Sequence, residues 1–278
     1  SSSDDGDGSA WFAQVSYPND LHEASIEALR VGENFDPALG FVPRRGIRRY
    51  RGSYAYAPRL GTLVRQLKMQ LRPELVTEED GRTVSAQTLL RVAELEFESG
   101  DELRFDVVNF REVLDDPFDI RDGQSIDAGA YTFLRYGFVA ESSSHRPVDA
   151  RLSVFAGEFW DGDRVDVGLD LGFRPGNWGA FAFEYDRNGI KLPGDDFVVH
   201  VARARANLQF GPRLSWSNFV QWDNQSEQLG LNSRLWWILQ PGNELFFVVN
   251  QGWEWDPDRG VTPEDSNIAL KLGYTLRM

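Results

Sequence analysis

The chain has 278 residues, a formal net charge of −14 and no cysteine. An acidic balance of this size argues against a nucleic-acid partner, because binding to DNA or RNA depends on basic surfaces. The lack of cysteine excludes a disulfide framework and a zinc site built from thiolates. The sequence has no run of about 18 apolar residues, which excludes a membrane-spanning helix. A mean hydropathy of −0.42 still fits a membrane β-barrel, because only alternate strand residues meet lipid.

Residues 1–8 are small, acidic and rich in glycine, which predicts a flexible extracellular loop remnant. From residue 9 to residue 278, the sequence consists of segments of about 10 to 15 residues. Within each segment apolar and polar residues alternate, and turn signals separate one segment from the next. No amphipathic helix interrupts this pattern. The sequence therefore predicts one all-β domain over residues 9–278, an antiparallel transmembrane β-barrel with about 15 strands in this chain.

The predicted connections alternate in length. Tight turns are expected at 18–20, 58–61, 99–101, 175–177, 211–212 and 241–243. Longer acidic loops are expected near 33–46, 74–82, 112–125, 158–164, 187–196, 222–228 and 254–266. Short periplasmic turns and longer extracellular loops are typical of outer-membrane barrels.

Two segments, 165–174 and 229–240, show the alternation most clearly. Each is longer than an ordinary strand of about 5 to 6 residues and suits a tilted strand that crosses a bilayer in about 9 to 11. The apolar side of such strands predicts these lipid-facing residues: Val167, Leu169, Leu171, Leu235, Trp237, Leu270, Leu272 and Tyr274. The polar side predicts these lumen-lining residues: Arg104, Asp106, Arg151, Asp166, Asp170, Arg174, Glu184, Arg203, Arg205, Arg234 and Lys271.

The final residues, Ile268 to Met278, alternate strictly between the two kinds of side chain. They resemble the C-terminal recognition signal of bacterial outer-membrane barrels, with the assembly signal at Lys271, Gly273, Leu276 and Met278. This resemblance implies that the barrel assembly machinery is a partner.

Catalytic chemistry has little support in the sequence. The three histidines are His22, His145 and His200. His200 falls on the apolar register with no serine at neighbouring positions of that face, and His145 lies in a serine-rich turn. Paired acids lie on loops, where they would stay solvated. We therefore predict no enzyme and no cofactor. Ca²⁺ is the cation that the acidic extracellular loops would suit, with Asp256 and Asp258 as the candidate ligands.

Two segments carry a family resemblance: 32–44 continuing into 46–50, and 219–226 together with 241–245. They resemble the C-terminal β-barrel region of an uncharacterised bacterial outer-membrane family, which often carries an N-terminal module similar to family 9 carbohydrate-binding domains. The resemblance implies an outer-membrane barrel and supplies no catalytic residues. The carbohydrate module is absent from this sequence, so the resemblance does not imply sugar binding.

The expected protein is thus a bacterial outer-membrane β-barrel that acts as a channel, translocation pore or surface scaffold, in contact with membrane lipid and lipopolysaccharide. The alternative is a soluble cell-surface β-protein that binds glycans through exposed aromatic side chains. Counting strands back from the C-terminus places the start of the first strand, near Ala10 to Tyr17, on the extracellular side. Because bacterial single-chain barrels have even strand numbers and periplasmic termini, an upstream fragment or second chain is expected to complete the barrel.

Overall fold

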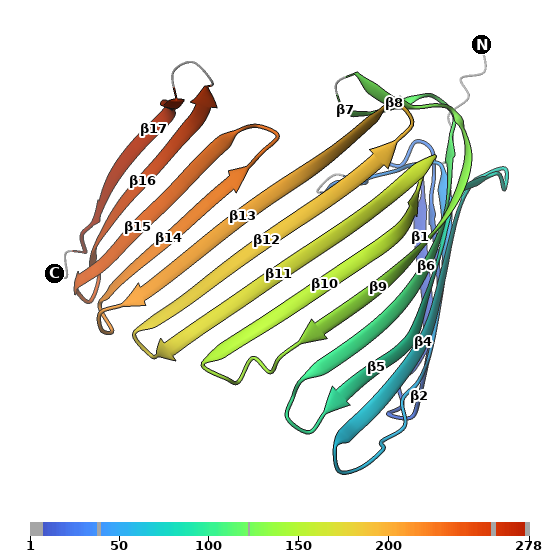
Figure 1. Ribbon diagram of the computed structural model, residues 1–278, viewed down its shortest axis with the longest axis horizontal. Coiled ribbons are helices and arrows are strands. Elements are labelled where there is room, and N and C mark those ends of the chain that lie inside the picture. The colour runs from blue at the N-terminus through green and yellow to red at the C-terminus, as the bar shows by residue number, and fades with distance from the viewer. Residues whose placement is uncertain (1–7, 38–39, 122, 257–259, 276–278) are drawn as a thin grey trace. The chain divides into compact units, whose positions relative to one another are not determined.

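A computed structural model describes residues 8–37, 40–121, 123–256 and 260–275. Within them, fifteen strands form one antiparallel sheet in the order β1-β2-β3-β4-β5-β6-β9-β10-β11-β12-β13-β14-β15-β16-β17, and β7 and β8 form a separate two-stranded sheet (Figure 1). The predicted all-β class and strand number are confirmed. No helix in the described residues is long and apolar enough to cross a membrane.

The strands have these bounds: β1 Ala10–Tyr17, β2 His22–Val31, β3 Ile47–Tyr56, β4 Val64–Glu78, β5 Thr83–Phe97, β6 Glu102–Leu114, β7 Phe118–Arg121, β8 Gln124–Ile126, β9 Gly129–Glu141, β10 Val148–Phe159, β11 Gly162–Gly176, β12 Gly179–Leu192, β13 Asp195–Gln209, β14 Leu214–Asp223, β15 Gln228–Gln240, β16 Asn243–Asp256 and β17 Gly260–Gly273. Two compact units share them. The first comprises Ser1–Val139, Phe155–Arg164 and Ile190–Asp196, and the second comprises Ala140–Val154, Val165–Gly189 and Phe197–Met278.

In the first unit, the register sorts side chains into a polar face and an apolar face. The polar face carries the cross-strand row Gln14, Glu27, Arg51, Glu74 and Gln87. The apolar face carries the row Tyr17, Ala24, Tyr54, Leu71 and Leu90. Its side chains are open to the surroundings: Val15 is 76% exposed and Ile26 is 71% exposed. The sheet therefore does not bury this apolar face.

The second unit shows the same division. On its apolar face, Trp216, Leu235, Phe247 and Leu270 form one cross-strand row, and Trp237, Leu245 and Leu272 belong to neighbouring positions of that face. On its polar face, Phe219, Asn232, Asn250 and Asn267 form the corresponding row. Leu270 and Leu272 are 62% and 65% exposed. Strand alternation thus gives both units one unburied apolar face.

The prediction that short turns alternate with longer loops is only partly correct. Long connections separate β2 from β3 and β6 from β9, but the segments 158–164 and 187–196 are almost wholly strand. Two-residue turns suffice there, at 160–161 and 193–194. The prediction of longer loops at these two places was wrong. It was also wrong over most of 74–82 and 254–266, because residues 74–78, 254–256 and 260–266 belong to β4, β16 and β17. Acidic residues in a strand do not interrupt its backbone hydrogen bonds. Trp160 adopts φ = 53° and Gly194 φ = 104°, as tight hairpin turns require.

The connection predicted as a loop over 112–125 contains the hairpin of β7 and β8. Ile126 is buried, with 3% of its surface exposed. Gln124 Nε2 donates to the carbonyl oxygen of Pro193 at 3.2 Å, and Arg121 Nη2 lies 3.4 Å from Asp195 Oδ2. The hairpin is therefore tied to the turn between β12 and β13.

The strand order ends with β1 on one side and β17 on the other. No hydrogen-bonded pairing joins these two strands in the part of the chain that the structure describes. Completion of the barrel by a further fragment or chain stays a prediction. Of the expected assembly signal, Lys271 and Gly273 lie in β17, whereas Leu276 and Met278 lie outside the described residues.

Candidate functional site on the polar face

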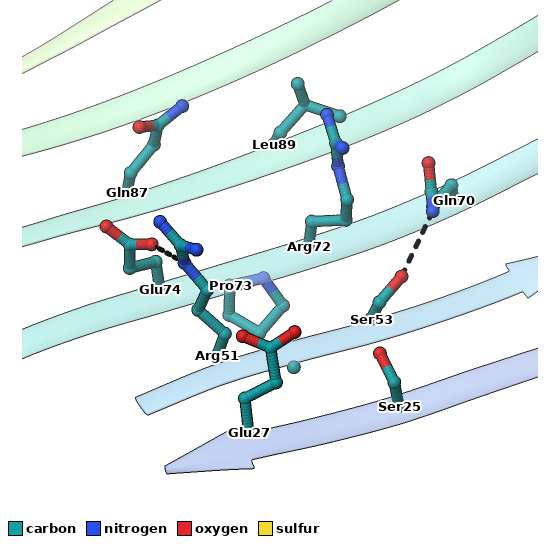
Figure 2. Close-up of a pocket in the computed structure, with 11 residues that line it drawn as sticks. Ser25, Glu27, Arg51, Ser53, Gln70, Arg72, Pro73, Glu74, Gln87 and Leu89 are labelled. Carbon is teal, nitrogen blue, oxygen red and sulfur yellow. Dashed lines mark hydrogen bonds and ion pairs between the residues drawn. The ribbon is translucent and has the colours of Figure 1, made fainter. Parts of the chain in front are cut away.

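The polar face of the first unit is hollowed across β2, β3, β4 and β5. The hollow has a volume of about 490 Å³, and its charged lining residues are Glu27, Arg51, Arg72 and Glu74. Figure 2 shows Arg51 reaching Glu74, with which it forms an ion pair, whereas the side chain of Arg72 extends toward Leu89. Ser25, Ser53, Gln70 and Gln87 supply neutral polar groups. The two acids and two arginines balance in formal charge.

Pro73 explains why the sheet opens at this hollow. The register joins Arg51 to Glu74 and Tyr54 to Leu71, but no pair is formed at the two positions between. Proline has no N–H group to donate to the ladder, so it interrupts the pairing of β3 with β4. Gly52 lies against the ring: a Cβ atom there would come within 3.3 Å of Pro73 Cγ. Gln70 Nε2 instead donates to Ser53 Oγ at 3.0 Å.

A buried group of charges lies nearby on β5 and β6. The side chain of Asp106 is only 4% exposed, and each of its oxygens has an arginine partner. Arg91 Nε lies 3.0 Å from Oδ1, and Arg104 Nε lies 3.1 Å from Oδ2. Arg91 also pairs with Glu94. Because burial of a lone carboxylate is costly, the two guanidinium groups offset the cost of burying the Asp106 side chain.

In the second unit, ion pairs cross from β12 to β13. Arg203 Nη1 lies 2.9 Å from Asp186 Oδ2 and 3.6 Å from Glu184 Oε2. Arg205 also pairs with Glu184, and its guanidinium carbon lies 5.0 Å from the centre of the Phe219 ring. Opposite charges in facing positions stabilise neighbouring strands.

This charged row continues onto β9, β10 and β11. Asp170 has Arg151, Glu184, Asp186 and Glu141 as electrostatic neighbours. The ion pair of Arg151 is with Glu141, at 4.0 Å.

Arg174 ends the charged region of the second unit. It pairs with Asp149, and its Nη2 donates to the carbonyl oxygen of Ser144 at 2.7 Å. A hollow of about 220 Å³ lies beside it, lined by Asp149, Asp170, Glu184 and Arg205 among others. The polar face of this unit is therefore also indented.

The residues predicted to line a lumen share the polar face of their own unit. Arg104 and Asp106 belong to the first unit, and the other nine belong to the second. Arg234 and Lys271 occupy the polar register of β15 and β17, where they form no ion pair with any described residue. Sequence reasoning missed many ion-paired residues of the first unit, among them Arg51, Glu74, Arg91 and Glu94. Alternation within β3 and β5 was the signal that could have found them.

The residues predicted to face lipid occupy the apolar register of β11, β15 and β17, and Tyr274 follows β17. His200 also lies on this register, as predicted, two residues before Ala202. Its Nδ1 is 2.7 Å from the hydroxyl oxygen of Tyr185, and the two rings stack. Tyr185 therefore gives the imidazole of His200 a hydrogen-bond partner. The pair does not include the serine hydroxyl that a hydrolase would need as its nucleophile.

In the described residues, no three His, Cys, Asp or Glu side chains are grouped so that they could hold a metal ion. Asp258 lies outside these residues, as does the side chain of Asp256. At the turn between β4 and β5, Arg82 pairs with Glu78 and with Asp115. The hydrogen bond from Arg82 holds the pKa of the Asp115 carboxyl below its usual value. The ion pair between Arg82 and Asp115 joins the connection between β4 and β5 to the one between β6 and β7, at the same end of these strands.

No protein-family model matches the sequence, and no curated protein matches it either. The resemblance to an outer-membrane family with a carbohydrate-binding module therefore stays a prediction. The function has to be inferred from the two faces of the sheet.

Proposed function

We propose that this chain forms the greater part of a transmembrane β-barrel in a bacterial outer membrane, and that its polar face lines an aqueous path for polar solutes. The observation that carries the proposal is the sorting of side chains by face. In both units one face exposes aliphatic and aromatic side chains, and the other holds ion-paired acids and arginines. This is the pattern of a strand with lipid on one side and water on the other.

The exposure of the apolar face favours a membrane over water. Val15, Ile26, Ile268 and Leu270 are each more than 60% exposed. A soluble monomer rarely leaves large contiguous apolar surface uncovered, because such surface drives aggregation. The glycan-binding alternative accounts for exposed aromatic rings, but it does not account for the aliphatic residues beside them.

The composition of the polar face favours a path for polar solutes. Its arginines and acids are mostly paired, so a solute passing along it meets alternating charges without a strong net attraction to either sign. The alternative roles are a translocation pore or a surface scaffold. Under the same proposal, the partners are outer-membrane lipid, lipopolysaccharide, the barrel assembly machinery and the strands that complete the barrel. We propose no catalytic activity.

Spin labelling tests which face meets lipid. The chain has no native cysteine, so single cysteines at Leu270, Leu272, Ala269 and Lys271 can each carry one label. In vesicles, labels at positions 270 and 272 are expected to be relaxed mainly by oxygen, which concentrates in lipid. Labels at 269 and 271 are expected to be relaxed mainly by a water-soluble nickel chelate. All four sites lie on β17, so they share one local backbone.

Equal accessibility at neighbouring positions would contradict the proposed facing. A monodisperse protein that needs no detergent, with all four labels accessible to the nickel chelate, would favour the soluble glycan-binding alternative. A labelled cysteine at Leu239, which is exposed near the end of β15, is a useful reference for the membrane interface.

Conductance tests whether the path is open. The hairpin of β7 and β8 is fixed to the turn after β12 and is expected to narrow the mouth of the path. We expect replacement of residues 117–127 by a short glycine-serine linker to raise single-channel conductance. The protein should be extracted from outer membranes in mild detergent, so that any partner chain is retained. An absence of conductance both with and without the hairpin would favour the scaffold role.

A further inference from the structure

Two arginines face each other on the apolar face of the first unit. Arg30 of β2 and Arg48 of β3 are direct cross-strand partners, and the row continues through Thr77 to Thr83. In β2 and β3 this face is otherwise made of alanine, isoleucine, glycine, tyrosine and one histidine. A pair of positive charges is therefore an exception on this surface, and it calls for a physical explanation.

The pair lies at one boundary of the apolar band. The adjacent row toward the centre of the strands contains Ala13, Ala28, Tyr50 and Leu75, and Trp11 lies beside Arg30 in the arginine row itself. Beyond Arg30 and Arg48 comes the long connection between β2 and β3. Tryptophan and tyrosine are typical of the level at which lipid headgroups begin. Under the proposed function, Arg30 and Arg48 lie at the headgroup level of the extracellular leaflet.

Like charges in directly opposite positions destabilise a sheet. Glu79 reduces this repulsion by pairing with Arg30: its Oε1 lies 3.0 Å from Arg30 Nε and 2.8 Å from Nη2. Arg48 forms no ion pair or hydrogen bond in the described ranges of the chain. The row therefore keeps the positive charge of Arg48, which pairs with no acid among the described residues, next to an apolar surface.

We infer that Arg48, with Arg30, binds the phosphate groups of a phosphorylated glycolipid in the outer leaflet, whose acyl chains cover the apolar rows below. The inference rests on the proposed function. A guanidinium group matches phosphate in charge and can donate two parallel hydrogen bonds to it. Tyr50 lies in the row next to the charged one and Ile26 in the row after it, so one lipid molecule can contact both the arginines and the apolar side chains.

The overall charge of the protein sharpens this inference. At −14 the chain repels anionic lipid in general, so attraction to phosphate must come from a local basic site. A free phosphate ion would meet the same guanidinium groups but would leave the apolar rows uncovered. A lipid is therefore expected to bind far more tightly than the ion.

The inference can be tested with detergent-solubilised full-length protein by native mass spectrometry. The probe is diphosphorylated lipid A, and the comparison ligands are monophosphorylated lipid A, phosphatidylcholine and inorganic phosphate. The test variants are Arg48→Gln and Arg30→Gln combined with Arg48→Gln. The matched control is Arg59→Gln, an exposed arginine in the connection between β3 and β4 whose ion pair within the described residues is with the exposed Asp20.

We expect the double variant to bind diphosphorylated lipid A at least roughly tenfold more weakly, as loss of a charge-assisted contact implies. Arg48→Gln should show part of this loss, and Arg59→Gln should match the parent protein. Equal binding by parent and double variant would overturn the inference, and so would displacement of lipid A by millimolar inorganic phosphate. Unchanged heat-dependent migration on gels shows that the variants fold.

Failure of the proposed function would be seen separately. Flotation of the parent protein with vesicles reports membrane insertion, whereas the binding measurement in micelles does not require it. If the protein fails to float, the proposed function is wrong, whatever the lipid A result. If the protein floats but the double variant keeps its affinity for lipid A, only the lipid site is wrong.

Discussion

Replacing Asp106 by alanine is expected to lower the free energy of unfolding by about 3–5 kcal/mol, because it removes one partner from a buried set of ion pairs. The Asp106 side chain is 4% exposed, and those of Arg91 and Arg104 are 13% and 21% exposed. Without the carboxylate, Arg104 keeps only the longer contact with Glu102, at 3.8 Å. Denaturant unfolding in lipid vesicles, followed by tryptophan fluorescence, measures the loss.

A surface ion pair supplies the control for this prediction. Arg59 and Asp20 lie 3.3 Å apart, with side chains 73% and 89% exposed. Asp20→Ala should cost less than about 1 kcal/mol, because solvent screens the pair and both side chains lose conformational freedom by forming it. If the two variants lost similar stability, the group around Asp106 would not be the anchor that its burial indicates.

The strands themselves were largely predictable from the sequence. The segment 165–174 predicted as a strand falls within β11, Gly162–Gly176, and the segment 229–240 falls within β15, Gln228–Gln240. Alternation works well in these long strands because their two faces have different surroundings, so polar and apolar side chains follow the period of two of a strand.

The pairs on the polar face were harder to predict, because they depend on register. That Arg51 lies opposite Glu74, or that Arg30 lies opposite Arg48, follows only once each hairpin is aligned to the residue. Register shifts add to this difficulty: β4 and β5 are offset at three places along their pairing. Alternation predicts the face on which a residue lies, but it does not predict which residue lies opposite on the next strand.

The connections were predicted least well, and the reason is physical. Acidic runs such as 158–164 resemble loops because charge is common in loops, yet here only residues 160–161 form the turn, and the charged residues on either side belong to β10 and β11. Conversely, the hairpin of β7 and β8 has strands of only four and three residues, too short for alternation to be detected. Charge content therefore located the ends of the strands poorly.

The sharpest test of the membrane assignment is expected from Leu235→Arg. Leu235 lies near the middle of β15, between Trp216 of β14 and Phe247 of β16 on the apolar face. If that face meets lipid, an arginine near the bilayer midplane should cost about 2–4 kcal/mol. The quantity to measure is again the free energy of unfolding in vesicles.

Asn232→Arg is the matched variant, because it places the same side chain on the same strand but on the polar face. Asn232 bonds to Asn250 across the strands, at an exposed position, and a charge there stays in water. We expect this variant to lose no more than about 1 kcal/mol, the net contribution of one hydrogen bond. The difference between the two variants isolates the lipid contribution from the effect of a longer side chain. A difference close to zero would mean that the exposed apolar face meets water, and the outer-membrane assignment would then fail.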